Sequence, residues 1–167
     1  MSADTFVSAL FIITAVVAAG ILINAVYPIV WTSASTFSSS AHDTDTRMRT
    51  DFKIVNTYAK ASGNNAQIFI KNLGSTSIGP AELQTADVYI VTPAKLVNPS
   101  YGTGIGPDGY WTYTLKNSAN NLWDNGETLE IDVSMGTGES FTAADTYTFQ
   151  FVLPNGVQRS ADFTPST

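Results

Sequence analysis

The stretch that divides this chain is Phe6–Trp31, FVSALFIITAVVAAGILINAVYPIVW, which runs for 26 residues without a charged side chain. As an α-helix it would be about 39 Å long at about 1.5 Å per residue, against about 30 Å for the hydrocarbon core of a membrane. A cleaved signal peptide has a shorter apolar core after a basic start, whereas Met1–Thr5 holds no Lys or Arg. We therefore expect a retained helix that lipid or neighbouring helices cover.

Charge divides the chain at nearly the same place. Asp4 is the one formally charged residue among residues 1–42, whereas all eight Lys and Arg and thirteen of the fourteen acids lie in residues 43–167. We expect a hydrophobic membrane or filament-core helix with a Ser-rich neck in residues 1–42, and a globular head in residues 43–167. The head carries eight bases against thirteen acids, a net charge of −5. Nucleic acid is not an expected partner, because its phosphates are bound by clustered Lys and Arg.

Inside the apolar stretch, small side chains and one amide point to a helix partner. Ala15, Ala18 and Ala19 lie within about one helical turn of one another and allow two helices to approach closely. Asn24 is costly when it faces lipid and is better placed against a polar group of another helix. These four residues are our candidates for helix–helix packing. Pro28 removes a backbone donor, so we expect a bend there and not the end of the helix.

The neck leaves two questions open. Thr32–Ala41, TSASTFSSSA, is poor in helix formers and either continues the helix or forms a stalk. The nearest basic residues, Arg47, Arg49 and Lys53, all follow the apolar stretch, and the positive-inside rule would place that side in the cytoplasm. This signal is weak, because the first of them lies 16 residues beyond Trp31.

From Thr50 onward the hydrophobic period changes to two, which is typical of strands with one buried face. The clearest alternation runs through Leu129, Ile131 and Val133. Asn155-Gly156 between two alternating runs predicts a hairpin with a type I′ turn. About seven short strands, separated by Gly, Pro and Asn clusters, favour an immunoglobulin-like antiparallel sandwich without cysteines. The predicted fold is therefore α+β in outline: one long N-terminal hydrophobic α-helix followed by an all-β sandwich.

The sequence contains few residues that could form a catalytic or metal-binding site. His42 is the one histidine and there is no cysteine, so a His-based metal site and a Ser-His or Cys-His nucleophile lack their parts. Asp43 and Asp45 could contribute oxygen ligands, but a hard cation needs about six or more. We expect no catalytic residue, no cofactor, no metal and no small-molecule substrate.

Three aromatic residues flank loops of the predicted sandwich, namely Tyr101, Tyr110 and Trp123. They are candidate contacts for a protein or glycan partner, because large aromatic side chains with a polar tip are enriched at binding surfaces. The alternative is that they close the ends of the sandwich.

The order of several short motifs carries a resemblance. The start MSADTFVSALFIITAVVAAGILINAVYP, the Ser-rich neck, and then MRTDFKIVNTYA and IFIKNLGSTSI resemble the archaellum accessory protein G family, relatives of protein F and of the archaellins. The resemblance implies a non-enzymatic, stator-like component of the archaeal motility machinery. It implies a helix in the cytoplasmic membrane and a head outside the cell, in the pseudoperiplasm, that anchors the motor to the cell envelope. Protein F and the S-layer are the partners that the resemblance implies. A head outside the cell conflicts with the weak positive-inside signal of Arg47, Arg49 and Lys53.

Two alternatives keep the same architecture. The chain could be a filament-forming subunit, similar to an archaellin or a type IV pilin, with the helix in the core of an extracellular filament and homo-oligomeric packing. In the families that this alternative resembles, the precursors begin with a short basic leader that ends at Gly. This sequence begins Met1-Ser2-Ala3-Asp4. The second alternative is a surface-anchored binding module for a glycan or an S-layer protein, which would use the loop aromatics.

Overall fold

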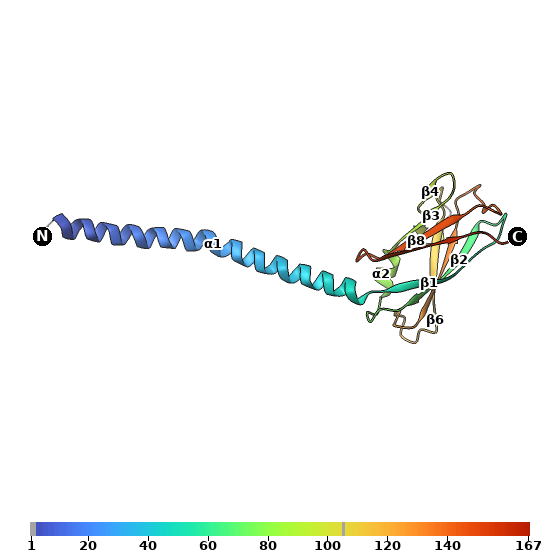
Figure 1. Ribbon diagram of the computed structural model, residues 1–167, viewed down its shortest axis with the longest axis horizontal. Coiled ribbons are helices and arrows are strands. Elements are labelled where there is room, and N and C mark those ends of the chain that lie inside the picture. Colours follow the sequence, from blue (N-terminus) through green and yellow to red (C-terminus); the bar gives the residue numbers. More distant parts are fainter. Residues whose placement is uncertain (1–2, 105) are drawn as a thin grey trace. The chain divides into compact units, whose positions relative to one another are not determined.

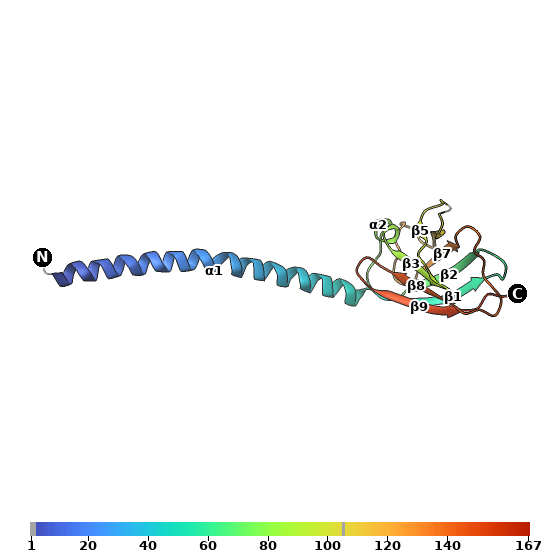
Figure 2. The ribbon, with the colours of Figure 1, turned by 90° about the horizontal axis from the view of Figure 1, so that it is seen from above.

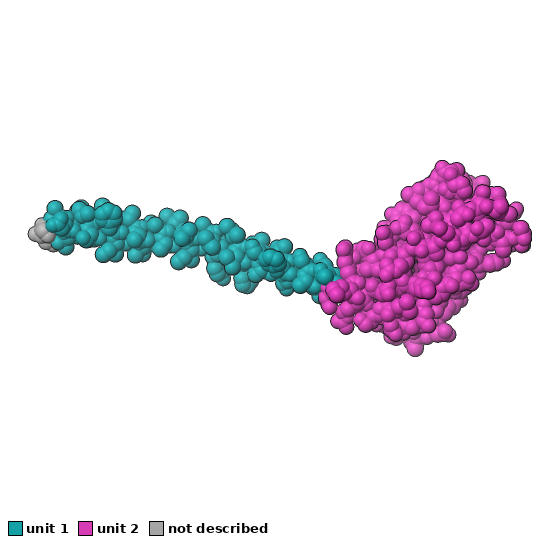
Figure 3. Space-filling view, in the orientation of Figure 1, with its two compact units in different colours: residues 1–44 teal, residues 45–167 magenta. Residues whose placement is uncertain are grey.

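A computed structural model describes residues 3–104 and 106–167 of the chain (Figure 1). The chain divides into two compact units, Met1–Thr44 and Asp45–Thr167, which are coloured separately in Figure 3. We call the second unit the head. The boundary drawn from the sequence, after residue 42, lies two residues earlier than this one.

The first helix, α1 (Ala3–Arg49), is continuous and has no buried residue. It passes through Pro28 without ending. The bend expected at Pro28 stays a prediction. The Ser-rich neck is helical, which answers the choice between helix and stalk. Its hydroxyls donate hydrogen bonds to carbonyls about one turn back, from Ser35 and Thr36 to Thr32 (both 2.9 Å) and from Thr44 to Ser40 (2.7 Å). These bonds satisfy the side-chain polar groups within the helix, so low propensity does not prevent helix formation.

The head is a sandwich of two sheets with one short helix, α2 (Pro80–Gln84) (Figures 1 and 2). The five-stranded sheet has the order β1 (Phe52–Ala59), β2 (Asn65–Asn72), β7 (Thr128–Ser134), β6 (Tyr110–Lys116), β5 (Ser100–Tyr101). The four-stranded sheet has the order β4 (Leu96–Val97), β3 (Asp87–Val91), β8 (Tyr147–Val152), β9 (Gln158–Phe163). Neighbouring strands are antiparallel except β5 and β6, which are parallel.

The predicted helix-plus-sandwich fold is confirmed, with two differences in detail. The described residues form nine strands and not about seven, because β4 and β5 have two residues each and are too short to show a period. The helix α2 was also missed, because five residues show no helical period. Its Leu83 is fully buried, so this helix contributes to the core.

The core lies between the inner faces of the two sheets. Leu129, Ile131 and Val133 of β7 are at most 1% exposed, as their alternation predicted. Aromatic rings fill the centre, and Phe151 lies edge-on to both Phe52 (5.6 Å between centroids) and Trp111 (6.2 Å). Burial of these large side chains supplies most of the favourable free energy of folding in such a domain.

The hairpin between β8 and β9 is present, but the expected type I′ turn is wrong. Among the described residues, Gly156 has a positive φ (82°) whereas Asn155 does not. The Gly156 amide donates to the carbonyl of Leu153 (2.8 Å), and the Leu153 amide donates to that of Val157 (3.0 Å). This is the longer loop in which a type I turn is followed by a left-handed glycine. Pro154 explains the difference. In a type I′ turn centred on Asn155-Gly156 it would be the residue before the turn, and it lacks the N–H that this position donates across the hairpin. Its fixed negative φ instead suits the first central position of the type I turn that is observed.

Candidate functional site

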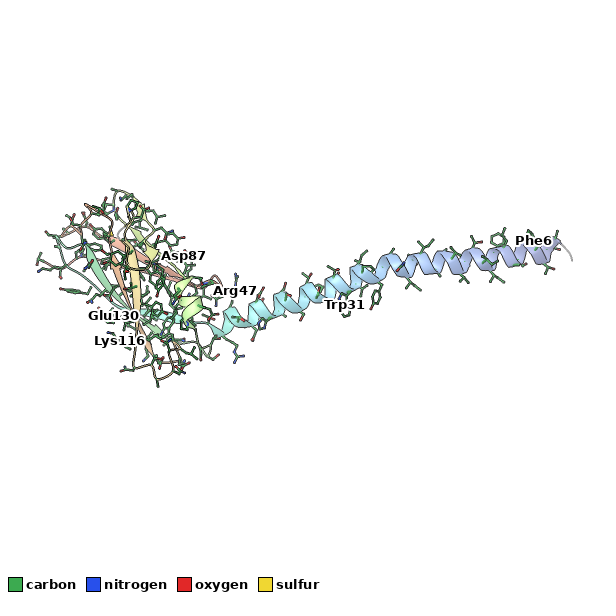
Figure 4. All side chains as sticks on the ribbon, turned by 180° about the vertical axis from the view of Figure 1, so that it is seen from behind. Phe6, Trp31, Arg47, Asp87, Lys116 and Glu130 are labelled. Carbon is green, nitrogen blue, oxygen red and sulfur yellow. The ribbon has the colours of Figure 1, made fainter. Side chains whose placement is uncertain are left out.

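The apolar surface of α1 is a first candidate interaction surface. Its large hydrophobic side chains are exposed throughout the apolar stretch, from Phe6 (74% exposed) to Trp31 (69%), both labelled in Figure 4. By length and composition, α1 is apolar enough to cross a membrane. Each large apolar side chain gains about 1.5–3 kcal/mol when it leaves water. This surface therefore requires lipid or other protein around it.

The residues predicted for helix–helix packing all lie on this exposed part of α1. Ala15, Ala18, Ala19 and Asn24 are exposed, and a Cβ added at Gly20 would meet no atom within 4 Å. Space for a second helix is thus open at the small residues. That these four residues pack against another helix stays a prediction.

The C-terminal end of α1 belongs to the head, and the loop after β2 caps it. The amides of Ser75 and Thr76 donate to the carbonyl of Arg49 (2.9 and 3.3 Å). A Cβ at Gly74 would lie 2.4 Å from that same carbonyl oxygen, so only glycine allows the loop to approach this closely. Carbonyls at a helix end have no partner inside the helix, and here the loop provides one.

Asn72, at the end of β2, holds this loop in place. Its side-chain amide donates to the carbonyls of Thr76 (3.0 Å) and Trp123 (2.8 Å), and its side-chain oxygen accepts from the Gly74 amide (2.9 Å). Asn72 is 1% exposed. A buried polar side chain with three bonds of this kind fixes the geometry of the segments that it joins.

The β8–β9 hairpin contacts the same end of α1. The side chain of Asn155 donates to the hydroxyl of Thr50 (3.0 Å). The guanidinium of Arg47, which is labelled in Figure 4, packs against Gly156. A Cβ added at Gly156 would lie 2.8 Å from Nη2 of Arg47. The sequence predicted the hairpin at Asn155-Gly156 but not its contact with α1, because a turn motif does not reveal what it packs against.

The three aromatic residues predicted as partner contacts lie in different surroundings. Tyr101 is 42% exposed and stacks on Tyr113 with 5.8 Å between ring centroids. Tyr110 is half-buried and lines a groove on the outer face of the five-stranded sheet. Trp123 is 0% exposed and donates its indole N–H to the carbonyl of Glu127 (3.1 Å). The prediction that Trp123 contacts a partner at the surface is therefore wrong, because this side chain is buried at the end of the core.

Three ionisable groups among the described residues of the head have shifted pKa values. The hydrogen bond to Glu139 raises the pKa of Lys95. Hydrogen bonds from Ser77 and Asn120 hold the pKa of Asp124 below its ordinary value of 3.8. Burial raises the pKa of Tyr113 above 10, with a further contribution from the charge of Tyr101. Among the described residues, no three His, Cys, Asp or Glu side chains come together as a metal site.

An ion pair on the outer face of the five-stranded sheet joins Lys116 of β6 to Glu130 of β7, both labelled in Figure 4. The side chain of Glu130 is only 11% exposed, whereas that of Lys116 is 46% exposed. The lysine thus provides the charge partner of a carboxylate that has lost most of its water.

A sequence model of archaeal-type flagellins matches residues 6–163, which include the apolar helix and nearly the whole head. The chain belongs to the archaeal-type flagellin family. No curated protein sequence matches it. This member of the archaeal-type flagellins is also similar to several solved structures.

The periplasmic stator protein FlaG of Sulfolobus acidocaldarius is 27% identical, with a TM-score of 0.55, over 68% of this chain and 99% of that one. The FlaF and FlaG stator complex of the same organism gives 27% identity, a TM-score of 0.54, and coverage of 67% and 87%. The archaeal flagellum of Methanospirillum hungatei is 14% identical, with a TM-score of 0.63, over 96% and 93% of the chains. At that identity the last comparison shows a shared fold alone.

These relatives are structural components of the archaellum. The chain is therefore an archaellum component related to the FlaG stator protein and to archaellin filament subunits, and it is not an enzyme. The resemblance found in the sequence motifs is confirmed at this level.

Proposed function

We propose that this archaeal-type flagellin relative is a membrane-anchored stator component of the archaellum, with its head outside the cytoplasm. The observation that carries the proposal is the 27% identity that extends over 99% of the FlaG chain. The identity to the filament subunit of Methanospirillum hungatei is 14%. By identity the chain is therefore nearer to the stator protein than to that filament subunit.

The helix supports a membrane anchor. The apolar part of α1 is long enough to cross a bilayer, and the polar part that follows, residues 32–44, adds about 20 Å at about 1.5 Å per residue. Tyr27 and Trp31 lie where the apolar part ends, as interfacial aromatic residues do in membrane helices. A helix of this kind leaves the membrane as a helix and continues into water without a break.

The partners follow from the same comparison. FlaG of Sulfolobus acidocaldarius has been solved in a complex with FlaF. We infer that this head likewise binds a FlaF-like protein, and that through it the motor is held against the S-layer and the cell envelope. A structural role of this kind needs no catalytic residue.

A filament subunit is the second candidate. It is favoured by the likeness to the Methanospirillum hungatei flagellum, which covers 96% of this chain and so includes the long helix. In this reading the small residues Ala15, Ala18 and Ala19 pack against the helices of other copies in the filament core. The chain would then be extracellular, and neighbouring subunits would cover α1 in place of lipid.

Fractionation of cells separates the two candidates. The full chain, tagged at its C-terminus, is produced in an archaeon that makes archaella, and the filaments are sheared off. A stator component stays with the membrane fraction while the host's own archaellin leaves with the filaments. Recovery of the tagged chain as a repeating component of sheared filaments would overturn the stator proposal in favour of the second candidate.

Protease treatment of intact cells tests the placement of the head. We expect added protease to remove the tagged head, because it lies outside the membrane. A protected head would instead support the cytoplasmic placement that Arg47, Arg49 and Lys53 suggest by the positive-inside rule.

A further inference from the structure

A groove of about 400 Å³ lies on the outer face of the five-stranded sheet, toward the end of β1 that is farther from α1. One row of cross-strand neighbours forms its floor: Tyr58 of β1, Gln67 of β2, Asp132 of β7 and Thr112 of β6. Four adjacent strands about 4.8 Å apart span about 14 Å. The groove thus has the length of a short extended molecule and not of a single ion.

The side chains in the groove combine aromatic rings with planar polar groups. Tyr58 is 50% exposed on one side, and Tyr110 is half-buried on the other. Between them the side-chain amide of Gln67 donates to the Asp132 carboxylate (3.0 Å). Aromatic rings bind the C–H faces of a flat ligand, while amides and carboxylates bind hydroxyl groups as both donors and acceptors.

The charge of the groove argues for a neutral ligand. Lys60 and Asp132 are the two charged residues that line it, and their charges cancel. An anionic ligand such as a phosphate is held by several cations or by a bidentate Arg, which the groove lacks among its lining residues. The side-chain amides of Asn64 and Asn65, also in the lining, hydrogen-bond to none of the described residues and so face solvent or a ligand.

The wall of the groove is held in a fixed conformation. It is formed by the β1–β2 loop, in which Ser62 adopts a positive φ of 62°. The amide of Ser62 donates to the carbonyl of Phe141 (2.8 Å), and the Phe141 amide donates back to the carbonyl of Gly63 (2.8 Å). The Met135 amide donates to the carbonyl of Asn64 (2.7 Å). A site held in this way loses little conformational entropy when a ligand binds.

We propose that this groove is a binding site for a short neutral oligosaccharide, with Tyr58 and Tyr110 as ring platforms and Gln67, Asp132 and the two asparagines as hydroxyl partners. Of the three aromatic contacts expected from the sequence, only Tyr110 belongs to it. The site lies wholly within the head and does not depend on whether the chain is a stator component or a filament subunit. In either case it would attach the head to a glycan-bearing surface.

Saturation-transfer NMR on the full chain tests the proposal. The protein is kept in lauryldimethylamine oxide, because a detergent with a sugar headgroup would compete for the groove. The probes are maltotetraose, cellotetraose, chitotetraose and mannotetraose at millimolar concentration. We expect saturation transfer to the ring protons of at least one probe. Absence of transfer to all four overturns the proposal.

Matched variants locate the binding. Tyr58→Ala should weaken the affinity for the bound probe about tenfold, as should Gln67→Leu. Tyr101→Ala is the control, because Tyr101 is an exposed aromatic residue of the same sheet outside the groove. Equal thermal denaturation of the variants establishes that each is folded. Equal binding by Tyr58→Ala and the unmodified chain, or loss of binding only in Tyr101→Ala, would show that the sugar does not occupy this groove.

Discussion

The side-chain amide of Asn72 donates a 2.8 Å hydrogen bond to the carbonyl of Trp123, 51 residues further along the chain. This bond joins the end of β2 to the loop before β7, directly beneath the segment that caps α1. Both residues are buried, at 1% and 0% exposure. The attachment of α1's last turn to the sandwich therefore depends on a polar contact within the core.

Asn72→Ala should lower the free energy of unfolding of the head by about 2–4 kcal/mol. The substitution removes three hydrogen bonds of a buried side chain, to the carbonyls of Thr76 and Trp123 and from the amide of Gly74. The Trp123 carbonyl keeps its bond from the Ile78 amide and the Gly74 amide keeps its bond to the Asp51 carbonyl. Urea unfolding followed by near-UV circular dichroism measures the change. Asn98→Ala removes an exposed amide and is the control, for which we expect no change beyond about 0.5 kcal/mol. Equal midpoints for the two variants would show that the bonds of Asn72 contribute little.

Gly74→Ala should destabilise the head by about 2 kcal/mol or more. The added Cβ would lie 2.4 Å from the Arg49 carbonyl oxygen and 2.5 Å from the Asp51 amide nitrogen, and both are backbone atoms that cannot move alone. Gly104→Ala is the control, because a Cβ there meets no atom within 4 Å. Thermal melting of both variants tests the contrast. An unchanged midpoint for Gly74→Ala would mean that the loop does not approach α1 this closely.

The Lys116–Glu130 pair should show coupling in a double-mutant cycle. Lys116→Met should cost about 1–2 kcal/mol, because it leaves the mostly buried Glu130 carboxylate without its partner. Glu130→Gln should cost less, since the half-exposed lysine is then solvated by water. In the double variant, Glu130→Gln should recover part of the free energy of unfolding that Lys116→Met removes. Strict additivity of the two single effects would contradict an interaction between these side chains.

Asp124 should make the stability of the head fall in acid. Hydrogen bonds to its ionised form lower its pKa in the folded state below the ordinary value of 3.8. The stabilisation is therefore complete above that value and is lost as the pH falls through the folded-state pKa. Melting temperatures of the unmodified chain and of Asp124→Asn, measured from about pH 6 to about pH 2, should converge at the acid end. A constant difference across this range would show that the ionised carboxylate is not the stabilising form.

Ala19→Phe should block helix–helix association of α1 and leave the head folded. A large side chain at this position prevents the close approach that small residues allow. Crosslinking of the full chain in membranes measures association, and head melting gives the control. Val17→Phe adds similar bulk at a position that already holds a larger, exposed residue, so it should associate normally. Equal crosslinking of both variants would exclude the alanine patch as the contact.

Much of the architecture follows from local pattern. The apolar run determines a helix of membrane-spanning length, and the alternation in β7 identifies its buried face, because both depend only on the spacing of neighbouring residues. The hairpin at Asn155-Gly156 was also visible, although its turn type was not. Pro154 changes the backbone of that loop, which the Asn-Gly signal alone does not show.

The candidate sites were predicted less well, since each depends on residues distant in sequence. Nothing near Asn72 or Gly74 indicates that they meet Trp123 and Arg49. Likewise, the groove is assembled from four strands whose order, β1, β2, β7, β6, departs from the order in the chain. The sequence alone determined that this protein has an exposed apolar helix and a β-rich acidic head, because composition and periodicity are local properties. Which side chains share a surface or cap α1 was decided by the pairing of strands in the tertiary structure.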